Sequence, residues 1–198
     1  MAGAGRTSGE ARAGRDLVDG TTTAWRREMP EVDRVDVELT RRAARLGVLL
    51  QDRLAACLEP WGMTRADYNV LNVLRAAGAP YELRPTDLRS RLLLSSGGIS
   101  NVLNRLARSG LIARERDARD GRGSWVRLTQ DGVETAEATM RAWVADQEVL
   151  YRNVTESQAR AASDALRQVL LAIGDREPAE PHARSKRESL GDAGAASA

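Results

Sequence analysis

Residues 95–129 read SSGGISNVLNRLARSGLIARERDARDGRGSWVRLT, and this stretch decides the fold. It opens with apolar residues that recur at helical spacing: Ile99, Val102, Leu103 and Leu106. Gly110 ends this predicted helix, and two strand-like runs, 111–116 and 125–128, follow on either side of a turn rich in Arg, Gly and Asp. A helix that leads into a basic β-hairpin is the layout of a winged helix-turn-helix. It predicts a helix in the DNA major groove with a charged loop beside it.

The composition favours an ordinary globular protein without metal or covalent chemistry. Of 198 residues, 42% are hydrophobic and 29% charged, and no apolar run approaches the roughly 20 residues that cross a bilayer. The first residues lack the apolar core of a signal peptide, so we expect a cytoplasmic protein with no membrane partner. A single cysteine, Cys57, and a single histidine, His182, exclude an internal disulfide, a cysteine-cluster metal site and the usual catalytic triads. We therefore expect no enzyme activity, no cofactor and no metal.

Charge is unevenly distributed along the chain, although the net charge is only +2. Residues 84–128 contain ten Arg against four acidic residues, an excess of +6, whereas residues 129–175 carry −4. The basic excess falls on the segment that resembles a DNA-reading module, which is the electrostatic footprint expected of a nucleic-acid-binding surface.

Periodicity, caps and breakers divide the rest of the chain into further helices. We expect helices over 16–29, 33–58, 64–77, 85–93, 95–109, 129–153 and 155–173, and one short strand over 81–83. Capping boxes start two of these helices, Thr64 with Asp67 and Thr155 with Gln158. The fold class is therefore mainly α with a small β-wing.

The same pattern predicts five parts of the chain. They are a disordered tail over 1–14, N-terminal dimerisation helices over 15–62, a winged helix-turn-helix lobe over 63–128, C-terminal dimerisation helices over 129–175 and a disordered tail over 176–198. The outer helices carry apolar stripes that the chain is too short to cover, so we expect the N- and C-terminal helices to form a homodimer interface.

In a helix-turn-helix, the second helix faces the base edges. Here that helix is the one predicted over 95–109, and we expect it to present short side chains. If its apolar residues face inward, small or polar residues face outward: Ser96, Gly97, Ser100, Asn101 and Asn104. Asn binds adenine with two hydrogen bonds, and Ser binds either base edge. Arg105 lies at the border of this face, where it suits a phosphate or an ion pair with the wing.

The predicted wing combines cations with acidic residues. We expect Arg119 and Arg122 to enter a narrow minor groove, where negative potential is concentrated. Asp117 and Asp120 would repel phosphate if free, so we expect them to stabilise the wing by holding neighbouring arginines.

The run from 83 to 129 resembles the MarR (multiple antibiotic resistance) family of bacterial regulators, and the similarity extends over about 33–173. It rests on these features: Arg105-Leu106, Gly110-Leu111-Ile112, Asp117-x-Arg119-Asp120-x-Arg122 and Val126-x-Leu128-Thr129-x-x-Gly132. The resemblance implies a homodimeric winged helix-turn-helix protein that binds a palindromic operator, usually as a repressor released by a small ligand or an oxidant.

The resemblance also indicates where an effector would bind. The family's pocket lies between the dimerisation helices and the DNA-binding lobe. An aromatic or phenolic effector there would meet residues for which a core role is the more usual interpretation: Trp61, Met63, Tyr68 and Trp143. Trp25 resembles a tryptophan on an extra helix of urate-responsive members. Those members carry an aspartate where this chain has Asn69, which is a departure from the urate pattern.

Two alternatives remain open from the sequence. One is a winged-helix module that binds proteins and has no DNA function. The other is a redox-responsive regulator acting through Cys57, although this residue lies near the end of its helix, in register with apolar residues, as a buried structural thiol would.

Overall fold

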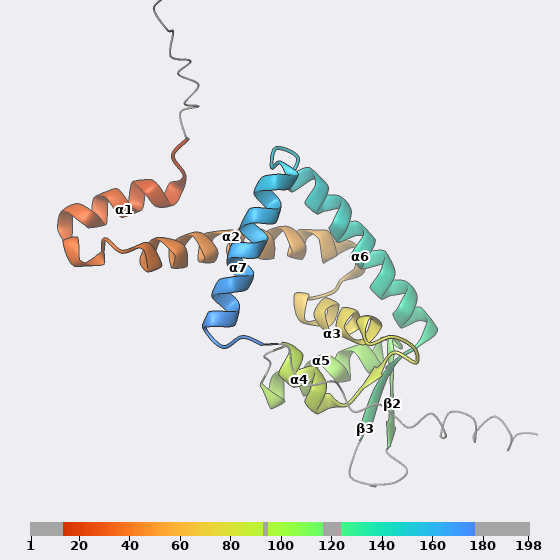
Figure 1. Cartoon of the computed structure of the whole chain (residues 1–198). Helices are drawn as coiled ribbons and strands as arrows, with labels where there is room; N and C mark the ends of the chain where they lie inside the picture. Colours follow the sequence, from red (N-terminus) through yellow and green to blue (C-terminus); the bar gives the residue numbers. More distant parts are fainter. Residues whose placement is uncertain (1–13, 93–94, 117–123, 177–198) are drawn as a thin grey trace, which may run out of the picture. The chain divides into compact units, whose positions relative to one another are not determined.

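The structure is a computed structural model that describes residues 14–92, 95–116 and 124–176. The elements follow in the order α1 (Leu17–Glu28), η1 (Pro30–Val32), α2 (Val35–Leu58), η2 (Glu59–Trp61), α3 (Arg65–Ala76), β1 (Glu82–Leu83), α4 (Pro85–Leu92), α5 (Ser96–Arg108), β2 (Ile112–Arg116), β3 (Ser124–Leu128), α6 (Gln130–Leu150) and α7 (Glu156–Ala172). The chain divides into two compact units, and the boundary between Asp52 and Arg53 falls inside α2. Figure 1 labels the seven α-helices listed above together with β2 and β3.

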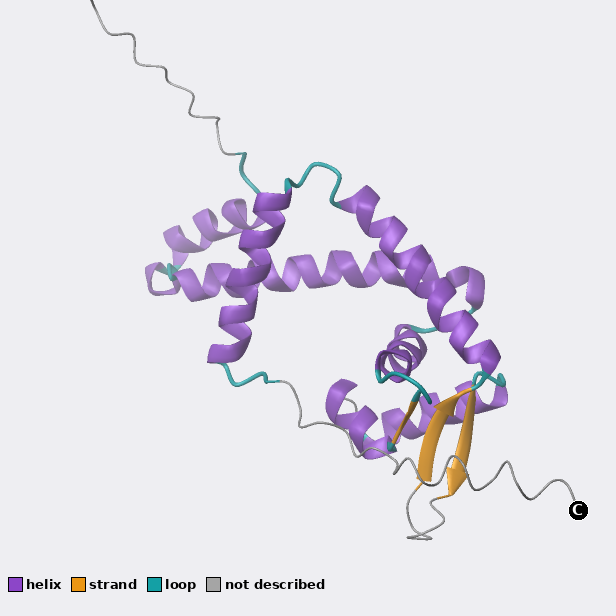
Figure 2. Ribbon diagram, turned by 45° about the vertical axis from the view of Figure 1, so that its right-hand side comes forward, coloured by secondary structure: helices purple, strands orange, loops and turns teal. Residues whose placement is uncertain are grey.

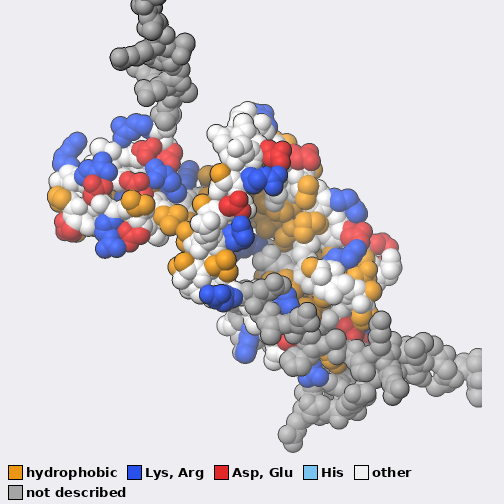
Figure 3. Space-filling model, viewed as in Figure 1, with side chains coloured by type: hydrophobic (Ala, Val, Ile, Leu, Met, Phe, Trp, Pro, Cys, Tyr) orange, Lys and Arg blue, Asp and Glu red, His pale blue; other side chains and the backbone are white. Residues whose placement is uncertain are grey.

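The first unit holds α1 against the N-terminal part of α2 through ion pairs. Asp16 caps α1 by accepting a hydrogen bond from the Asp19 backbone N–H at 2.8 Å, and the Asp19 carboxylate accepts one from the Asp16 backbone N–H at 2.9 Å, which completes a capping box. Arg42 of α2 then donates to three carboxylates, those of Asp16, Asp19 and Glu38, at 2.6–2.9 Å. Figure 3 shows basic and acidic side chains intermixed over this unit. Ion pairs from Arg42 to Asp16 and Asp19 therefore link the start of α1 to α2, and Val18 and Thr22 of α1 are buried.

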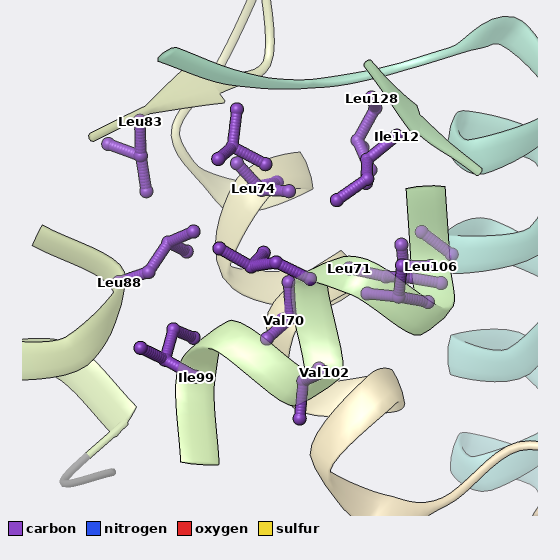
Figure 4. Close-up of a cluster of buried hydrophobic side chains, with 13 residues drawn as sticks. Val70, Leu71, Leu74, Leu83, Leu88, Ile99, Val102, Leu106, Ile112 and Leu128 are labelled. Atoms are coloured by element: carbon purple, nitrogen blue, oxygen red, sulfur yellow. The ribbon is translucent and has the colours of Figure 1, made fainter. Parts of the chain in front are cut away.

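The second unit is built around an apolar core that α3, α4, α5 and the sheet share. Figure 4 shows side chains from these elements converging on one another. The core residues at its centre are Val70, Leu71, Leu74, Leu83, Leu88, Ile99, Val102, Leu103, Leu106, Ile112, Val126 and Leu128. Complete burial of one such side chain contributes about 1.5–3 kcal/mol, so this core orients α5 firmly.

The sheet is small and antiparallel, with strand order β1-β3-β2 (Figure 2). Glu82 pairs with Arg127 and Leu83 with Val126, while β2 and β3 pair from Ile112↔Leu128 to Arg116↔Ser124. The predicted strand over 81–83 and the predicted hairpin strands are confirmed within one residue.

A close backbone contact joins the start of α6 to the turn between α5 and β2. Thr129 caps α6 by accepting from the Gly132 N–H at 3.0 Å, donates its hydroxyl to the Gly110 carbonyl at 2.7 Å, and gives its N–H to the Leu111 carbonyl at 3.1 Å. Gly132 lies against that same carbonyl, since a Cβ at this position would stand 2.0 Å from the Leu111 oxygen. Only glycine allows this approach.

Two helix ends differ from the sequence prediction. The long first helix begins at Val35 rather than 33, because η1 ends at Val32 and Asp33 caps it. The helix expected to reach 153 ends at Leu150, where Tyr151 takes the C-cap position and the chain turns toward the Thr155 cap of α7.

The outer helices leave apolar side chains exposed, as the unpartnered stripes predicted. In α2 these are Val35, Leu39, Leu46, Val48 and Leu49; in α6, Met140, Val144 and Val149; in α7, Leu166, Leu170 and Leu171. In α2, Leu54 and Leu58 are buried within the chain. Figure 3 shows hydrophobic patches over α6 and α7.

Candidate nucleic-acid interface

Helix α5 is positioned by a cap at its start and by its buried face. Ser95 adopts an extended backbone and its hydroxyl oxygen accepts from the Gly98 N–H at 3.1 Å. Four aliphatic residues on the inward face are buried: Ile99, Val102, Leu103 and Leu106. The opposite face of α5 is therefore held outward by the core.

The outward face carries short side chains from its first turn to Asn104, and the exposed Arg108 follows in the last turn. Gly97, Ser100, Asn101 and Asn104 are all exposed. Among the described residues, and apart from its chain neighbours and its own helix backbone, no heavy atom lies within 4 Å of a Cβ built at Gly97. Ser96 is the first residue of α5, and its side chain lies outside the described structure.

Arg105 differs from the other predicted contacts because its guanidinium is already engaged. Its Nε lies 2.9 Å and 3.0 Å from the two carboxylate oxygens of Asp67, and its Nη2 lies 2.7 Å from Oδ1. The Asp67 side chain is only 3% exposed. The ion pair predicted with the wing is therefore wrong in its partner, since the acid comes from α3. DNA contact by Arg105 stays a prediction.

Sequence reasoning identified Asp67 as the second residue of the α3 capping box and missed its pairing with α5. The box is present: Asp67 accepts from the Thr64 backbone N–H at 2.9 Å and from its hydroxyl at 2.7 Å. The capping-box acid could be recognised from the sequence, but its pairing with an arginine 38 residues away has no local signal.

The wing is described at its base and not at its tip. Arg119, Arg122, Asp117 and Asp120 lie outside the described residues, so their predicted roles stay predictions. At the base, Arg127 of β3 pairs with a neighbouring carboxylate of β2, Glu115.

A cation stacks on the aromatic residue of β3. The Arg84 guanidinium lies 4.9 Å from the ring centroid of Trp125, which is buried. These contacts hold the hairpin base beside α4.

The candidate effector residues are not gathered in one place. Trp61 and Met63 line a hollow of about 270 Å³, whose other lining residues are Gly62, Asp67, Arg105, Leu106, Ser109, Leu111 and Thr135. Tyr68, Asn69 and Trp143 are not part of its lining.

Tyr68 and Trp143 are buried instead, as a core position would require. The Tyr68 hydroxyl donates to the Met140 sulfur at 3.5 Å, and burial raises the pKa of this phenol. Trp25 belongs to the first unit, where Arg41 lies 5.9 Å from its ring centroid.

Cys57 is part-buried near the end of α2. Burial, and then the nearby carboxylate of Asp146, raise the pKa of its thiol. Within residues 14–92, 95–116 and 124–176, no three His, Cys, Asp or Glu side chains are grouped to hold a metal ion. No helix in those ranges is both long and apolar enough to cross a bilayer.

A core-held helix with a short-chained outward face, a preceding helix and a flanking hairpin define a winged helix-turn-helix protein. A sequence model of the MarR family matches residues 61–123. The transcriptional regulator PecS of Dickeya dadantii is 25% identical over 108 residues, which are 54% of this chain and 65% of PecS. The uncharacterised regulator YkoM of Bacillus subtilis is 37% identical over 73 residues, 37% of this chain and 46% of YkoM. The matches thus span less than two thirds of either relative.

Among solved structures, a mutant of E. coli MarR complexed with operator DNA superposes with a TM-score of 0.61. It is 24% identical and covers 79% of this chain and 99% of that one, which is a likeness of fold. The chain thus has the fold of a winged helix-turn-helix protein and is similar to the MarR family of transcriptional regulators over its central part.

Proposed function

We propose that this protein is a sequence-specific regulator of transcription that reads double-stranded DNA with α5. The outward face of α5 carries this proposal: Gly97, Ser100, Asn101 and Asn104 are exposed, short and uncharged. Such a surface approaches base edges closely and offers amide and hydroxyl groups to them. A surface meant only for water would more often carry Glu and Lys. The operator-bound MarR relative supports the same use of this fold.

A homodimer would place two copies of α5 on one face of the duplex. The exposed apolar residues of α2, α6 and α7 supply a surface that a second copy would bury. Two recognition helices about 34–36 Å apart match successive major grooves, so the operator would be palindromic. Binding there would repress transcription in the cytoplasm by blocking polymerase, and the protein would have no catalytic activity of its own.

A small aromatic or phenolic effector would release the repressor. The hollow beside Trp61 and Met63 adjoins α5 and is a candidate for binding it. A ligand that binds better to a dimer with a different spacing of its recognition helices would lower DNA affinity by shifting the population.

Selection of bound sequences from random duplex DNA tests the proposal. We expect a palindromic sequence to emerge, and Asn101→Ala to relax the preference at one position by about 1–3 kcal/mol. Arg119→Ala and Arg122→Ala should weaken binding to all sequences and flatten its salt dependence. Arg160→Ala is the matched control, because Arg160 is exposed on α7 and pairs only locally with Glu156. Failure to enrich any sequence would refute the proposal.

Neither alternative has a comparable observation in its favour. A protein-binding module does not explain the short uncharged face or the basic excess of residues 84–128. A redox switch needs a reactive thiolate, and the pKa of Cys57 is raised rather than lowered.

A further inference from the structure

A network of charge-assisted hydrogen bonds ties the recognition helix to the start of α3. Arg105 makes a forked contact with Asp67, with three N···O distances of 2.7–3.0 Å. Its Nη2 also donates to the Thr64 hydroxyl at 3.1 Å. Planar forked pairs of this kind fix the angle between the two groups as well as the distance.

The carboxylate of this pair is buried and accepts further hydrogen bonds. The Asp67 side chain is almost completely buried. Its carboxylate also accepts hydrogen bonds from the backbone N–H and the hydroxyl of Thr64 at the N-terminus of α3. The guanidinium is thus anchored to a capped helix end whose adjoining residues, Val70 and Leu71, are fully buried in the core.

This anchor acts on the DNA-reading face directly. Arg105 follows Asn101 by four residues, so the two lie one turn apart on the same side of α5. Fixing the Arg105 side chain to α3 therefore limits rotation of α5 about its own axis. The angle at which Asn101 meets a base edge depends on that rotation.

We propose that Asp67 is a positioning residue for sequence recognition, an inference that rests on the proposed DNA-binding function. Asp67 has two effects. It sets the rotation of α5, and it withholds the Arg105 cation from the phosphate backbone. Phosphate contacts raise affinity for every sequence equally, whereas base contacts discriminate. Keeping one cation per protomer away from phosphate thus favours the operator over other DNA.

Asp67→Asn tests both effects and preserves the cap, because the amide oxygen still accepts from the Thr64 N–H. Affinities for the selected operator and for random duplex are measured across a salt series. We expect the ratio of the two affinities to fall about tenfold or more. Affinity for random DNA should rise, and its salt slope should steepen by about 0.9 per protomer as the freed guanidinium meets a phosphate. An unchanged ratio or an unchanged slope overturns the proposal.

Arg105→Gln distinguishes a role of Arg105 in positioning α5 from direct contact of Arg105 with DNA phosphate. If Asp67→Asn does not fold, as judged by the lack of a cooperative thermal transition, Arg105→Gln alone tests the proposal. Loss of the anchor should lower the ratio, while the salt slope on random DNA stays that of the original chain. A slope flattened by about 0.9 per protomer would place Arg105 on phosphate in the original chain and overturn the inference.

Glu137→Gln is the matched control, because Glu137 of α6 also pairs with an arginine of α3, Arg75, at 2.8 Å. We expect Glu137→Gln to leave the ratio of operator affinity to random-DNA affinity, and the salt slope on random DNA, unchanged. A fall in the ratio as large as that of Asp67→Asn would overturn the assignment to Asp67. If the original chain prefers no sequence at all, the proposed function fails. If it discriminates and Asp67→Asn discriminates equally well, only the positioning role fails.

Discussion

Replacement of Gly132 by alanine should destabilise the winged lobe, although alanine is the better helix former. The added Cβ would lie 2.0 Å from the Leu111 carbonyl oxygen and 3.3 Å from a methyl carbon of Leu128. A relaxed contact needs about 3.5 Å, so α6 and this carbonyl would have to separate by roughly 1.5 Å. The obstacle is backbone, which cannot rotate away as a side chain would.

Three contributions set the expected magnitude. Overpacking of a tight contact costs about 1–3 kcal/mol. Separation also breaks the 3.1 Å bond from the Thr129 N–H to the Leu111 carbonyl, for about 1 kcal/mol. The gain in helix propensity offsets about 1 kcal/mol. The net loss is about 2 kcal/mol, or roughly 4–8 °C in Tm for a domain of this size.

Thermal and urea unfolding followed by circular dichroism measure this loss. Gly97→Ala is the matched control, because that helical glycine has no heavy atom within 4 Å of its added Cβ. We expect it to be as stable as the original chain or up to about 1 kcal/mol more stable. A Gly132→Ala variant at least as stable as Gly97→Ala would refute the close-contact reasoning.

Three other predictions follow from the charged and titratable groups. Alkylation of Cys57 should be slower at neutral pH than that of a free thiol because burial raises its pKa, and rapid labelling by iodoacetamide would contradict this. The hydrogen bond from Arg53 lowers the pKa of Asp146, so the stability from this pair is present above about pH 4 and lost as pH falls through the lower folded value. Asp146→Asn should therefore unfold more easily at pH 7 and match the original chain near pH 2; an equal difference at both pH values would argue against the pair. Arg42→Gln should raise the pKa of the Asp16 carboxyl and speed amide hydrogen exchange in α1, whereas unchanged exchange would mean that the ion pairs do not hold that helix.

Local signals in the sequence were sufficient for the secondary structure. Ser95, Thr64 and Thr155 each cap a helix where predicted, because a cap depends on residues three positions apart. The periodicity of Ile99 to Leu106 correctly assigned the buried face of α5, since burial follows the helical repeat.

Contacts between residues far apart in the chain could not be predicted from local sequence patterns. Asp67 and Arg105 are 38 residues apart, and nothing in their local sequence reveals that the core brings α3 and α5 together. The Gly132 approach to Leu111 has the same character. The motif that contains this glycine was recognised, yet the reason for a glycine there emerges only when the start of α6 meets Leu111, the residue before β2.

The short side chains on the outward face of α5 have a thermodynamic consequence. Serine and asparagine have few rotamers to lose when they are immobilised, and glycine has none, whereas a lysine or arginine forfeits up to about 2 kcal/mol. Recognition through Gly97, Ser100, Asn101 and Asn104 would thus carry a small entropic penalty on the protein side. A calorimetric titration with operator DNA would register this as a less unfavourable binding entropy than for a variant with arginine at position 104.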